Sequence, residues 1–344
     1  MEILEEAELC FPQINTSCKK HTRPQSESMI IFVLISFVSL LTIYYSFWWH
    51  HCFYKTAVCV GNNFQFVAMI LSHSRKLHTP TNLLLLSLAV SDFLVGLFVM
   101  PFQILLNEPC WFLDDLICVL FYFLTFIIVY ASLVNMVLIS VDRYVAICDP
   151  LRYSNRITHR RVRICVLLCW IYSVFYSFLF LSDNLKQPGR FNSCYGQCVI
   201  NVLVAVDLVI SFIIPISTIV ILYLRVFVVA VSQARAMRSH ITAVNLQSSV
   251  TVTVKKSELK AARTLGVVVT VFIMCYCPAY CLLLSNNDSI NSSSVKVFLC
   301  FLIYFNSCLN PIIYAFCYPW FRKCAKLIIT LEILQPDSWK ATVL

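Results

Sequence analysis

The chain has 344 residues, of which 60% are hydrophobic and only 12% are charged. A water-soluble globular protein of this length would have too few polar side chains to cover its surface, so the composition excludes that class. The formal net charge of +9 does not indicate a nucleic-acid-binding protein, because the basic residues are spread between apolar runs and do not form one patch.

Seven apolar runs reach or exceed the roughly 20 residues that a helix needs to cross a bilayer. They are Met29–Trp49, Leu83–Leu106, Leu116–Ile139, Val162–Leu181, Val199–Ala230, Leu265–Leu284 and Val295–Cys317. The chain is therefore predicted to be an all-α membrane protein. A seven-transmembrane helix bundle (residues 29–317) would follow an N-terminal tail (residues 1–28) and precede a C-terminal segment (residues 318–344).

The charged residues indicate how the bundle is oriented. Basic residues fall on alternate connections, namely Arg75, Lys76, Arg143, Arg152, Arg156, Arg160, Arg161, Arg163, Arg235, Arg238, Lys255, Lys256, Lys260, Arg322 and Lys323. The opposite connections carry Glu108, Asp114, Asp115, Asp183 and Asp288. By the positive-inside rule, this distribution predicts an extracellular N-terminus and a cytoplasmic C-terminus.

The N-terminal tail contains a glycosylation sequon at Asn15, which is meaningful only if this side is lumenal during synthesis. Most of the 18 cysteines lie inside spans, where thiols behave as small apolar side chains. Six lie on or near the predicted outer face, where disulfides persist: Cys10, Cys18, Cys110, Cys118, Cys194 and Cys198. Their pairing stays open at this point.

The first apolar region, residues 29–72, is about twice as long as one bilayer crossing and is interrupted by His50, His51 and Lys55. The trio His50-His51-Cys52 raises the possibility of a metal site, but adjacent residues on a helix point in different directions. An interfacial polar cluster is the favoured interpretation.

Two acidic residues lie within predicted spans, where an ionised carboxylate is costly unless it is paired or hydrated. Asp92 in the second span is either a site for a small cation or a neutral, hydrogen-bonded acid. Asp207 lies eight residues before Pro215 and hence about two turns toward the outer face. It either pairs with a ligand cation, or is protonated and bonded to a neighbouring helix, or lies near the interface.

The third span ends with Asp142-Arg143-Tyr144, and an arginine at a membrane edge is often only an interfacial anchor. The seventh span contains Asn306, Asn310 and Pro311. The proline removes one helical hydrogen bond and kinks the helix, and the two amides need polar partners that lipid does not offer. This part of the seventh span is therefore predicted to face a polar bundle interior.

The stretch from Asn306 to Phe321, NSCLNPIIYAFCYPWF, resembles the seventh-span fingerprint of the trace amine-associated receptors, which are rhodopsin-like G-protein-coupled receptors. The shorter Asn310-Pro311…Tyr314 part occurs throughout the rhodopsin-like receptors, whereas the extension through Tyr318-Pro319-Trp320-Phe321 is more specific. The resemblance covers roughly residues 15–326. It implies a short amphipathic helix after span seven, beginning at Tyr318, with the cytoplasmic tail behind it.

The resemblance also implies an activation switch. Asp142, Arg143 and Tyr144 match its core, and Glu258 matches the acidic partner that holds Arg143 in the inactive state of some relatives. Further residues that match the switch are Tyr223, Tyr276, Asn310, Pro311 and Tyr314. Tyr276 departs from the family pattern, which has tryptophan there. Opening of this switch would admit a heterotrimeric G protein, of the stimulatory or olfactory type, at the cytoplasmic side.

Three further features follow from the resemblance. Asp92, Ser132, Asn306 and Asn310 match a sodium site, and no other cofactor is expected. Cys118 is expected to pair with Cys198, and Cys18 with Cys194. Residues 43–58 match nothing in the first span of the family, so they are expected to be an insertion, with a retained intron or a mis-joined exon as the favoured explanation.

Many amine receptors place an aspartate on the third span, eighteen residues before the switch arginine, where this chain has Thr125. A neutral hydroxyl does not balance a buried ammonium. The chain resembles the fish branch of trace amine receptors, which carry an aspartate on the fifth span instead. Asp207 is therefore the expected counter-ion of a cationic amine, and Tyr130, Tyr280 and Tyr304 are candidate aromatic walls.

The predicted function is thus an olfactory-type amine receptor in the plasma membrane. Another rhodopsin-like receptor for a biogenic monoamine and a non-functional product of a mis-spliced gene stay open as alternatives. A secondary transporter would show broken helices repeated in two halves, and an enzyme would show a nucleophile–base or metal cluster. Neither pattern is present in the sequence.

Overall fold

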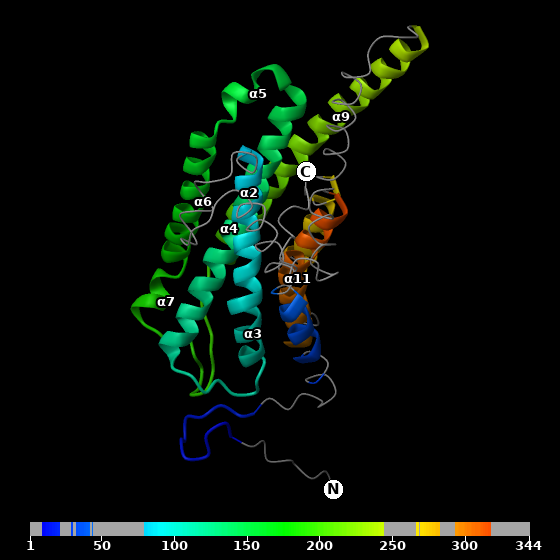
Figure 1. Cartoon of the computed structure of the whole chain (residues 1–344). Coiled ribbons are helices and arrows are strands. Elements are labelled where there is room, and N and C mark those ends of the chain that lie inside the picture. The colour runs from blue at the N-terminus through cyan, green and yellow to red at the C-terminus, as the bar shows by residue number, and fades with distance from the viewer. Residues whose placement is uncertain are drawn as a thin grey trace, which may run out of the picture.

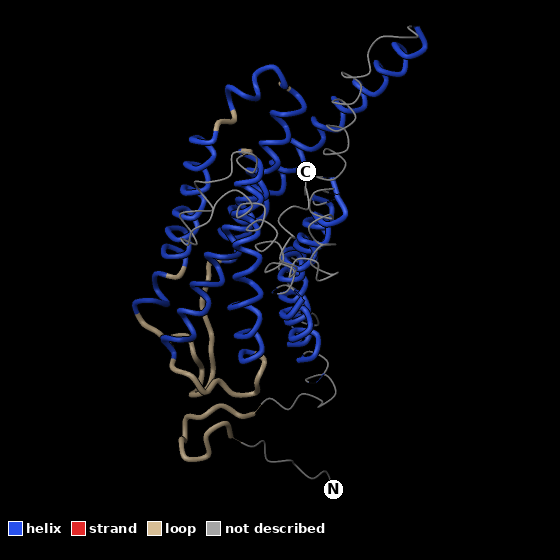
Figure 2. The backbone as a smooth tube through the Cα atoms, viewed as in Figure 1, coloured by secondary structure: helices blue, strands red, loops and turns tan. Residues whose placement is uncertain are grey.

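The computed structural model describes residues 9–20, 29, 32–41, 43, 79–243, 266–267, 269–282 and 293–317. These residues form an all-helical bundle, and they contain no β-strand beyond two isolated bridges (Figures 1 and 2). Four helical spans are long and apolar enough to cross a membrane: Pro80–Leu106, Asp115–Cys148, His159–Phe180 and Val204–Ser232. Shorter apolar helices cover Phe32–Leu41, Val269–Leu282 and Val297–Asn310.

The second span consists of three consecutive segments: α2 (Pro80–Leu94), the π-helical turn η1 (Val95–Val99) and α3 (Met100–Leu106). Thr79 caps its start by accepting a hydrogen bond from the Asn82 backbone. One residue after the π-helical turn comes Pro101, which lacks an N–H group and whose ring displaces the carbonyl four residues earlier, within the turn. The proline thus accounts for the widened turn.

The fifth span repeats this arrangement with α8 (Val204–Asp207), the π-helical turn η2 (Leu208–Ile213) and α9 (Ile214–Ala243). Pro215 is the second residue of α9, and only Ile214 separates it from the widened turn. The sequence predicted a span from Val199, but residues 199–203 are not helical. Asn184 explains this later start, because its side-chain amide donates to the Asn201 carbonyl and accepts from the Asn201 N–H.

The third span, α4 (Asp115–Cys148), lies at the centre of the bundle and packs against α2, α6 and α9. It extends nine residues beyond the predicted end at Ile139. The short helix α5 (Pro150–Arg156) connects it to α6 (His159–Phe180), and α7 (Ser182–Lys186) follows α6. The described part of the bundle ends with α11 (Ser293–Cys317).

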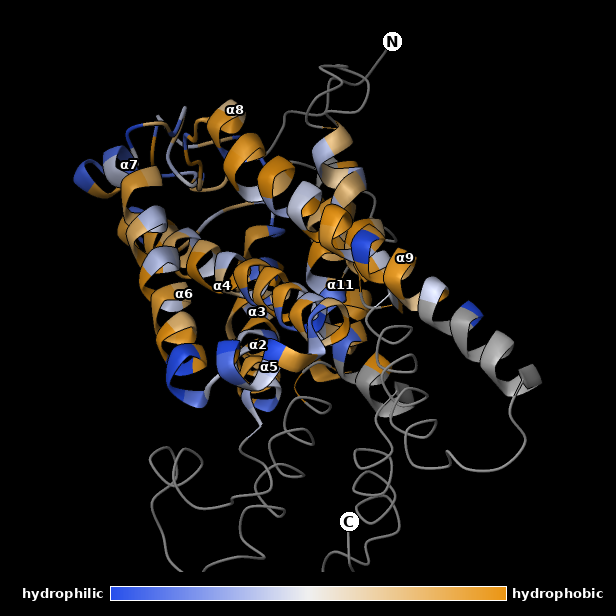
Figure 3. Ribbon diagram, turned by 90° about the horizontal axis from the view of Figure 1, so that it is seen from above, coloured by the Kyte–Doolittle hydropathy of each residue, from blue (hydrophilic) through white to orange (hydrophobic). Residues whose placement is uncertain are grey.

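The α6 helix lies at the edge of the bundle and buries few of its side chains. Apolar side chains such as Leu167 and Phe175 are about 60% exposed there, at 61% and 60%. In a bilayer such side chains face lipid. Figure 3 shows the complementary pattern, with hydrophilic residues gathered at α5, α7 and the start of α6.

The core combines apolar packing with an unusual set of buried polar side chains. Leu88, Met136, Ile219 and Phe272 are fully buried between four helical segments. The first helical segment joins the core through Ser39, which donates a hydrogen bond to the Gly96 carbonyl of η1.

Several sequence predictions lie outside the described residues. These are residues 44–58 of the expected insertion, His50, His51 and Cys52, the Glu258 switch partner, and the expected helix after Cys317.

Candidate functional site

Asp207 lies at the end of α8, where the π-helical turn begins, and its side chain is half-buried. The Tyr130 hydroxyl of α4 and the Ser211 hydroxyl of η2 each donate a hydrogen bond of 2.7 Å to the same carboxylate oxygen, Oδ1. The two donors leave the other carboxylate oxygen, Oδ2, without a hydrogen bond from a described residue. Among the described residues, no basic side chain forms an ion pair with Asp207.

Aromatic side chains surround this carboxylate. Tyr172, Tyr176 and Tyr280 lie within electrostatic range of Asp207. The Tyr130 ring makes an edge contact with Tyr176, with centroids 4.9 Å apart, and Tyr280 stacks on Phe212 at 4.4 Å. Aromatic faces near an anion can hold the organic part of a cation that pairs with it.

The sequence did not indicate Tyr172 and Tyr176, although a signal was present. The two tyrosines lie four residues apart on a predicted apolar span and therefore share one helix face. Their rings stack with centroids 5.8 Å apart. A pair of hydroxylated rings on one face of a membrane helix indicates a polar site nearby, and Tyr176 packs edge-on against Tyr130, which donates a hydrogen bond to Asp207.

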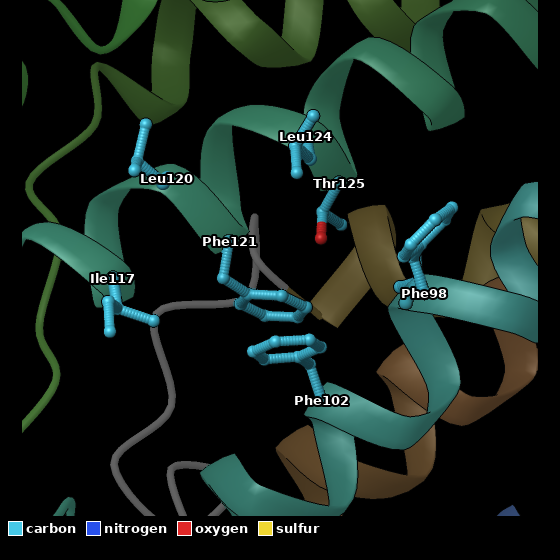
Figure 4. Close-up of a pocket in the computed structure, with 8 residues that line it drawn as sticks. Phe98, Phe102, Ile117, Leu120, Phe121, Leu124 and Thr125 are labelled. Carbon is cyan, nitrogen blue, oxygen red and sulfur yellow. The ribbon is translucent and has the colours of Figure 1, made fainter. Parts of the chain in front are cut away.

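The five expected ligand-binding residues are not all brought together. Tyr130 donates a hydrogen bond to Asp207, and Tyr280 belongs to the aromatic group near Asp207 through its stacking on Phe212. Tyr304 instead packs in a separate apolar cluster with Met100 and Ile128. Thr125 lines a cavity of about 120 Å³ between α4 and the η1–α3 segment (Figure 4).

A second polar cluster surrounds Asp92 in the middle of the bundle. Asp92, Asn135, Asn306 and Asn310 are fully buried, and the Asn310 amide donates to Asp92 Oδ2 at 3.1 Å. The Ser132 hydroxyl, the Asn306 amide and the Asn310 amide oxygen have no hydrogen-bond partner in the described part of the chain.

These groups fit a small hard cation, because such ions take carboxylate, hydroxyl and amide oxygens as ligands. Asn135, which the sequence analysis did not single out, adds a further buried amide with no partner in the described part of the chain. Within that part no group of three or more His, Cys, Asp or Glu residues forms a metal site.

The C-terminal end of α4 holds Asp142, which is 1% exposed and accepts hydrogen bonds from three side chains. Thr81 donates at 2.9 Å, Tyr153 donates at 2.9 Å, and Arg143 donates through Nε at 3.0 Å and forms an ion pair. Burial raises the pKa of Tyr153, so its hydroxyl remains a donor at neutral pH.

Thr81 and Tyr153 thus connect α2 and α5 to the carboxylate of Asp142, a role that the sequence did not indicate. Tyr144 packs beside Ile147 and Val226 and so contacts α9.

The remaining expected switch residues lie on three helices, namely α9, the helical residues 269–282 and α11. Tyr276 is buried and stacks on Phe272 with ring centroids 4.4 Å apart. The Tyr223 hydroxyl lies against Gly266. Pro311 and Tyr314 belong to α11, but their side chains are outside the described residues.

The end of the bundle nearest Asp207 is cross-linked by three disulfides. Two are the pairs expected above, Cys118–Cys198 and Cys18–Cys194, and the third joins Cys10 to Cys110. The tail segment, residues 9–20, is thereby tied to two loops. Figure 1 shows this segment below the loops at that end of the bundle. Asn15 is exposed on a turn of this segment.

Backbone contacts hold the tail segment in register with the loop that precedes span five. The Tyr195 N–H donates to the Thr16 carbonyl, and the Cys18 N–H donates to the Tyr195 carbonyl. Gly196 has a positive φ of 94°, and its carbonyl accepts from the Trp111 N–H.

Comparison with known proteins gives one consistent result. Residues 61–314 match the family model of the 7 transmembrane receptor (rhodopsin family). Trace amine-associated receptor 13c of Danio rerio is 34% identical, with 97% of this chain and 95% of the relative covered. Trace amine-associated receptor 8a of Rattus norvegicus is 35% identical, with 96% and 95% covered, and receptor 9 of Homo sapiens is 34% identical, with 97% and 94% covered.

Proposed function

The chain belongs to the trace amine-associated receptors of the rhodopsin family, and we propose that it detects cationic amines through Asp207. As a member of this family it is a multi-pass plasma-membrane receptor that couples a ligand to a G protein, and it is not an enzyme. The proposal concerns the ligand, its counter-ion and the orientation and partners of the receptor.

The observation that carries the proposal is the hydrogen bonding of the Asp207 carboxylate. Tyr130 and Ser211 both donate to Oδ1, so the second oxygen, Oδ2, accepts no hydrogen bond from a described residue. An ionised acid within a membrane span needs a balancing cation. An alkylammonium ligand supplies that cation and donates its N–H groups to the oxygen that the protein leaves open.

The aromatic residues near Asp207 determine what the remainder of the ligand meets. Tyr130 and Tyr176 present rings on the α4 and α6 side, whereas Phe212 and Tyr280 form a stacked pair. Attraction between a cation and an aromatic face contributes about 0.5–2 kcal/mol. The site therefore favours amines whose substituents are alkyl or aryl groups over those that carry further charges.

We propose that ligand binding at Asp207 is transmitted along α4 to the C-terminal end of that helix. Tyr130 and Asp142 lie on the same helix, twelve residues apart, so a ligand that moves Tyr130 acts on the helix that holds Asp142 and Arg143. The cluster around Asp92 lies between them in the bundle interior. Asp92, Ser132, Asn306 and Asn310 would hold a sodium ion, which supplies positive charge to balance the buried carboxylate.

We expect an extracellular N-terminus, because the disulfides and the sequon lie at one end and the basic residues at the other. The G protein would then bind at the end that carries Arg143, and a stimulatory or olfactory type is expected. Expression in chemosensory cells is part of the same proposal.

The first prediction concerns the variant Asp207→Asn, which removes the charge and keeps the shape of the side chain. The concentration of alkylamine that gives a half-maximal cAMP response should rise by at least about thirtyfold, since an unpaired buried charge partner costs about 2–5 kcal/mol. Surface expression, measured with an N-terminal tag, should be unchanged.

Asp183→Asn is the matched control, because Asp183 is an exposed acid on α7 that pairs only with Lys186 in the described chain. It should respond to amines as the wild type does. An unchanged amine response in Asp207→Asn would remove Asp207 from the ligand site, whereas equal losses in both variants would indicate a general effect of surface charge.

A further inference from the structure

The cavity of about 120 Å³ between α4 and the η1–α3 segment is separate from the hydrogen-bonded group around Asp207. Its walls are aliphatic and aromatic side chains, including Phe98, Phe102, Phe121 and Leu124. Phe102 and Phe121 stack with centroids 5.3 Å apart and form one wall (Figure 4). No charged side chain lines it.

One polar atom faces this apolar space, the hydroxyl oxygen of Thr125. Thr125 is 5% exposed, and its hydroxyl has no hydrogen-bond partner among the described residues. Figure 4 shows the oxygen pointing from α4 into the space between Phe121 and Phe98.

Two other threonines of the same bundle satisfy their hydroxyls on their own helix. Thr218 donates to the Ile214 carbonyl and Thr270 donates to the Gly266 carbonyl, each at 2.8 Å and four residues earlier on the helix. This back-bonding is the usual way in which a membrane helix satisfies a threonine hydroxyl. Thr125 does not use it, and a buried polar group without a partner is unfavourable. A bound molecule with a hydrogen-bonding group would supply the partner.

The mouth of the cavity opens toward lipid. Leu120 and Leu124 of α4 are 42% and 51% exposed, and Phe98 of η1 is 45% exposed. Because these side chains belong to membrane-spanning helices, their exposed surfaces contact acyl chains. A molecule dissolved in the bilayer therefore reaches the cavity without passing the disulfide-linked end.

We propose that this cavity is a second ligand site, which binds a small neutral molecule with one hydrogen-bonding group that enters from the bilayer. The volume fits a single ring, since an apolar cavity of about 150 Å³ in another protein binds benzene. The absence of charged lining residues excludes an ammonium head group, so the ligand class differs from that of the Asp207 site. Thr125 determines the preference for a hydroxyl or carbonyl group over a pure hydrocarbon.

The test uses 4-fluorophenol and fluorobenzene as probes, with the full-length receptor in phosphatidylcholine nanodiscs and fluorine NMR as the readout. Empty nanodiscs report partition into lipid, which does not saturate. With the receptor present, the fluorine NMR signal of 4-fluorophenol should show a saturable binding component in addition to this partition. No amine is present, so the result is independent of the Asp207 proposal.

Leu124→Trp fills the cavity and should abolish the saturable component. Leu116→Trp is the matched control, because Leu116 is a 45% exposed residue of the same helix that does not line the cavity. If Leu124→Trp fails to fold, Leu120→Trp takes its place. Leu120 lines the same mouth of the cavity, one helical turn before Leu124. Thr125→Val should weaken 4-fluorophenol about fivefold, the equivalent of one hydrogen bond, and leave fluorobenzene unchanged.

Three results would overturn the proposal. The first is no saturable binding above empty nanodiscs, and the second is wild-type binding in a variant that fills the cavity. The third is an equal loss of both probes in Thr125→Val, because a hydroxyl that recognises the ligand must distinguish them.

Discussion

Gly266 packs against Tyr223 of α9 so closely that a Cβ atom at this position would lie 1.9 Å from the Tyr223 hydroxyl oxygen. The next ring atom would lie at 2.6 Å, so the whole phenol would have to move. At this residue the lack of a side chain allows two helices to approach, and a tyrosine from one fills the space beside the other. The contact places the Tyr223 hydroxyl at the end of the bundle that carries Arg143.

Gly266→Ala should therefore lower stability, although alanine is the better helix former by about 1 kcal/mol. Overpacking of a tight contact costs about 1–3 kcal/mol and exceeds that gain. The melting temperature of the purified receptor should fall, and Tyr223→Leu in the same chain should restore it by removing the phenol. A melting temperature at or above that of the wild type in Gly266→Ala alone would show that the ring moves aside freely.

At the scale of elements, the two π-helical turns are the features that shape the candidate sites. The turn η1 brings Phe98 to the Thr125 cavity, and η2 brings Ser211 to Asp207. In each case a proline is the second residue after the turn, so one local cause explains both. A π-helical turn holds an extra residue, and its loss would rotate every preceding side chain by about 100° around the helix axis.

Pro215→Ala should therefore weaken the amine response, because an ordinary α-helical turn would rotate Asp207 away from Tyr130. We expect the half-maximal concentration to rise at least tenfold with normal surface expression. Pro101→Ala is the control, since the same change in η1 leaves the Tyr130–Asp207 hydrogen bond in place. Equal potency of Pro215→Ala and the wild type would mean that the turn persists without its proline.

The elements themselves were largely predictable, because apolar runs of bilayer length leave few alternatives to helices. The end of α4 at Cys148 was not, since residues beyond Ile139 are too polar to count as a span although they continue the helix. The start of span five was missed because it depends on Asn184, which is distant in sequence.

For the candidate site, an acid within a span was enough to single out Asp207 and Asp92. Their partners required the structure, since hydroxyls such as Ser211 are common in membrane helices. The separation of Thr125 and Tyr304 from Asp207 also required it, because sequence spacing along a family pattern does not show which way a side chain points.

At the scale of the whole molecule, the disulfides connect segments that are far apart in sequence. Cys118 is buried at the start of α4, whereas Cys10 and Cys110 are partly exposed. Cys118–Cys198 therefore fixes the central helix to the loop before span five, and Cys10–Cys110 fixes only the tail segment to the loop before α4. The three bonds differ in what they position, although their chemistry is the same.

Loss of the Cys118–Cys198 bond should consequently reduce the surface amount and melting temperature most, since a disulfide contributes about 2–4 kcal/mol and this one positions α4. We expect Cys10→Ser with Cys110→Ser to have the smallest effect, because Cys18–Cys194 still holds the tail segment. A cell-surface immunoassay of the paired cysteine variants measures the surface amount of each and so ranks the effects of losing the three disulfides. The reverse order would show that the tail segment, and not the loop before span five, organises this end.

The turn between Cys10 and Cys18 has a further consequence for experiments on intact cells. A protease that cut the chain once between Phe11 and Ser17 would release nothing, because Cys10–Cys110 still holds the N-terminal piece and the other piece contains the bundle itself. With the extracellular N-terminus that we propose, an epitope fused to it would stay on the cell after such a nick and would be shed only when a reductant was added.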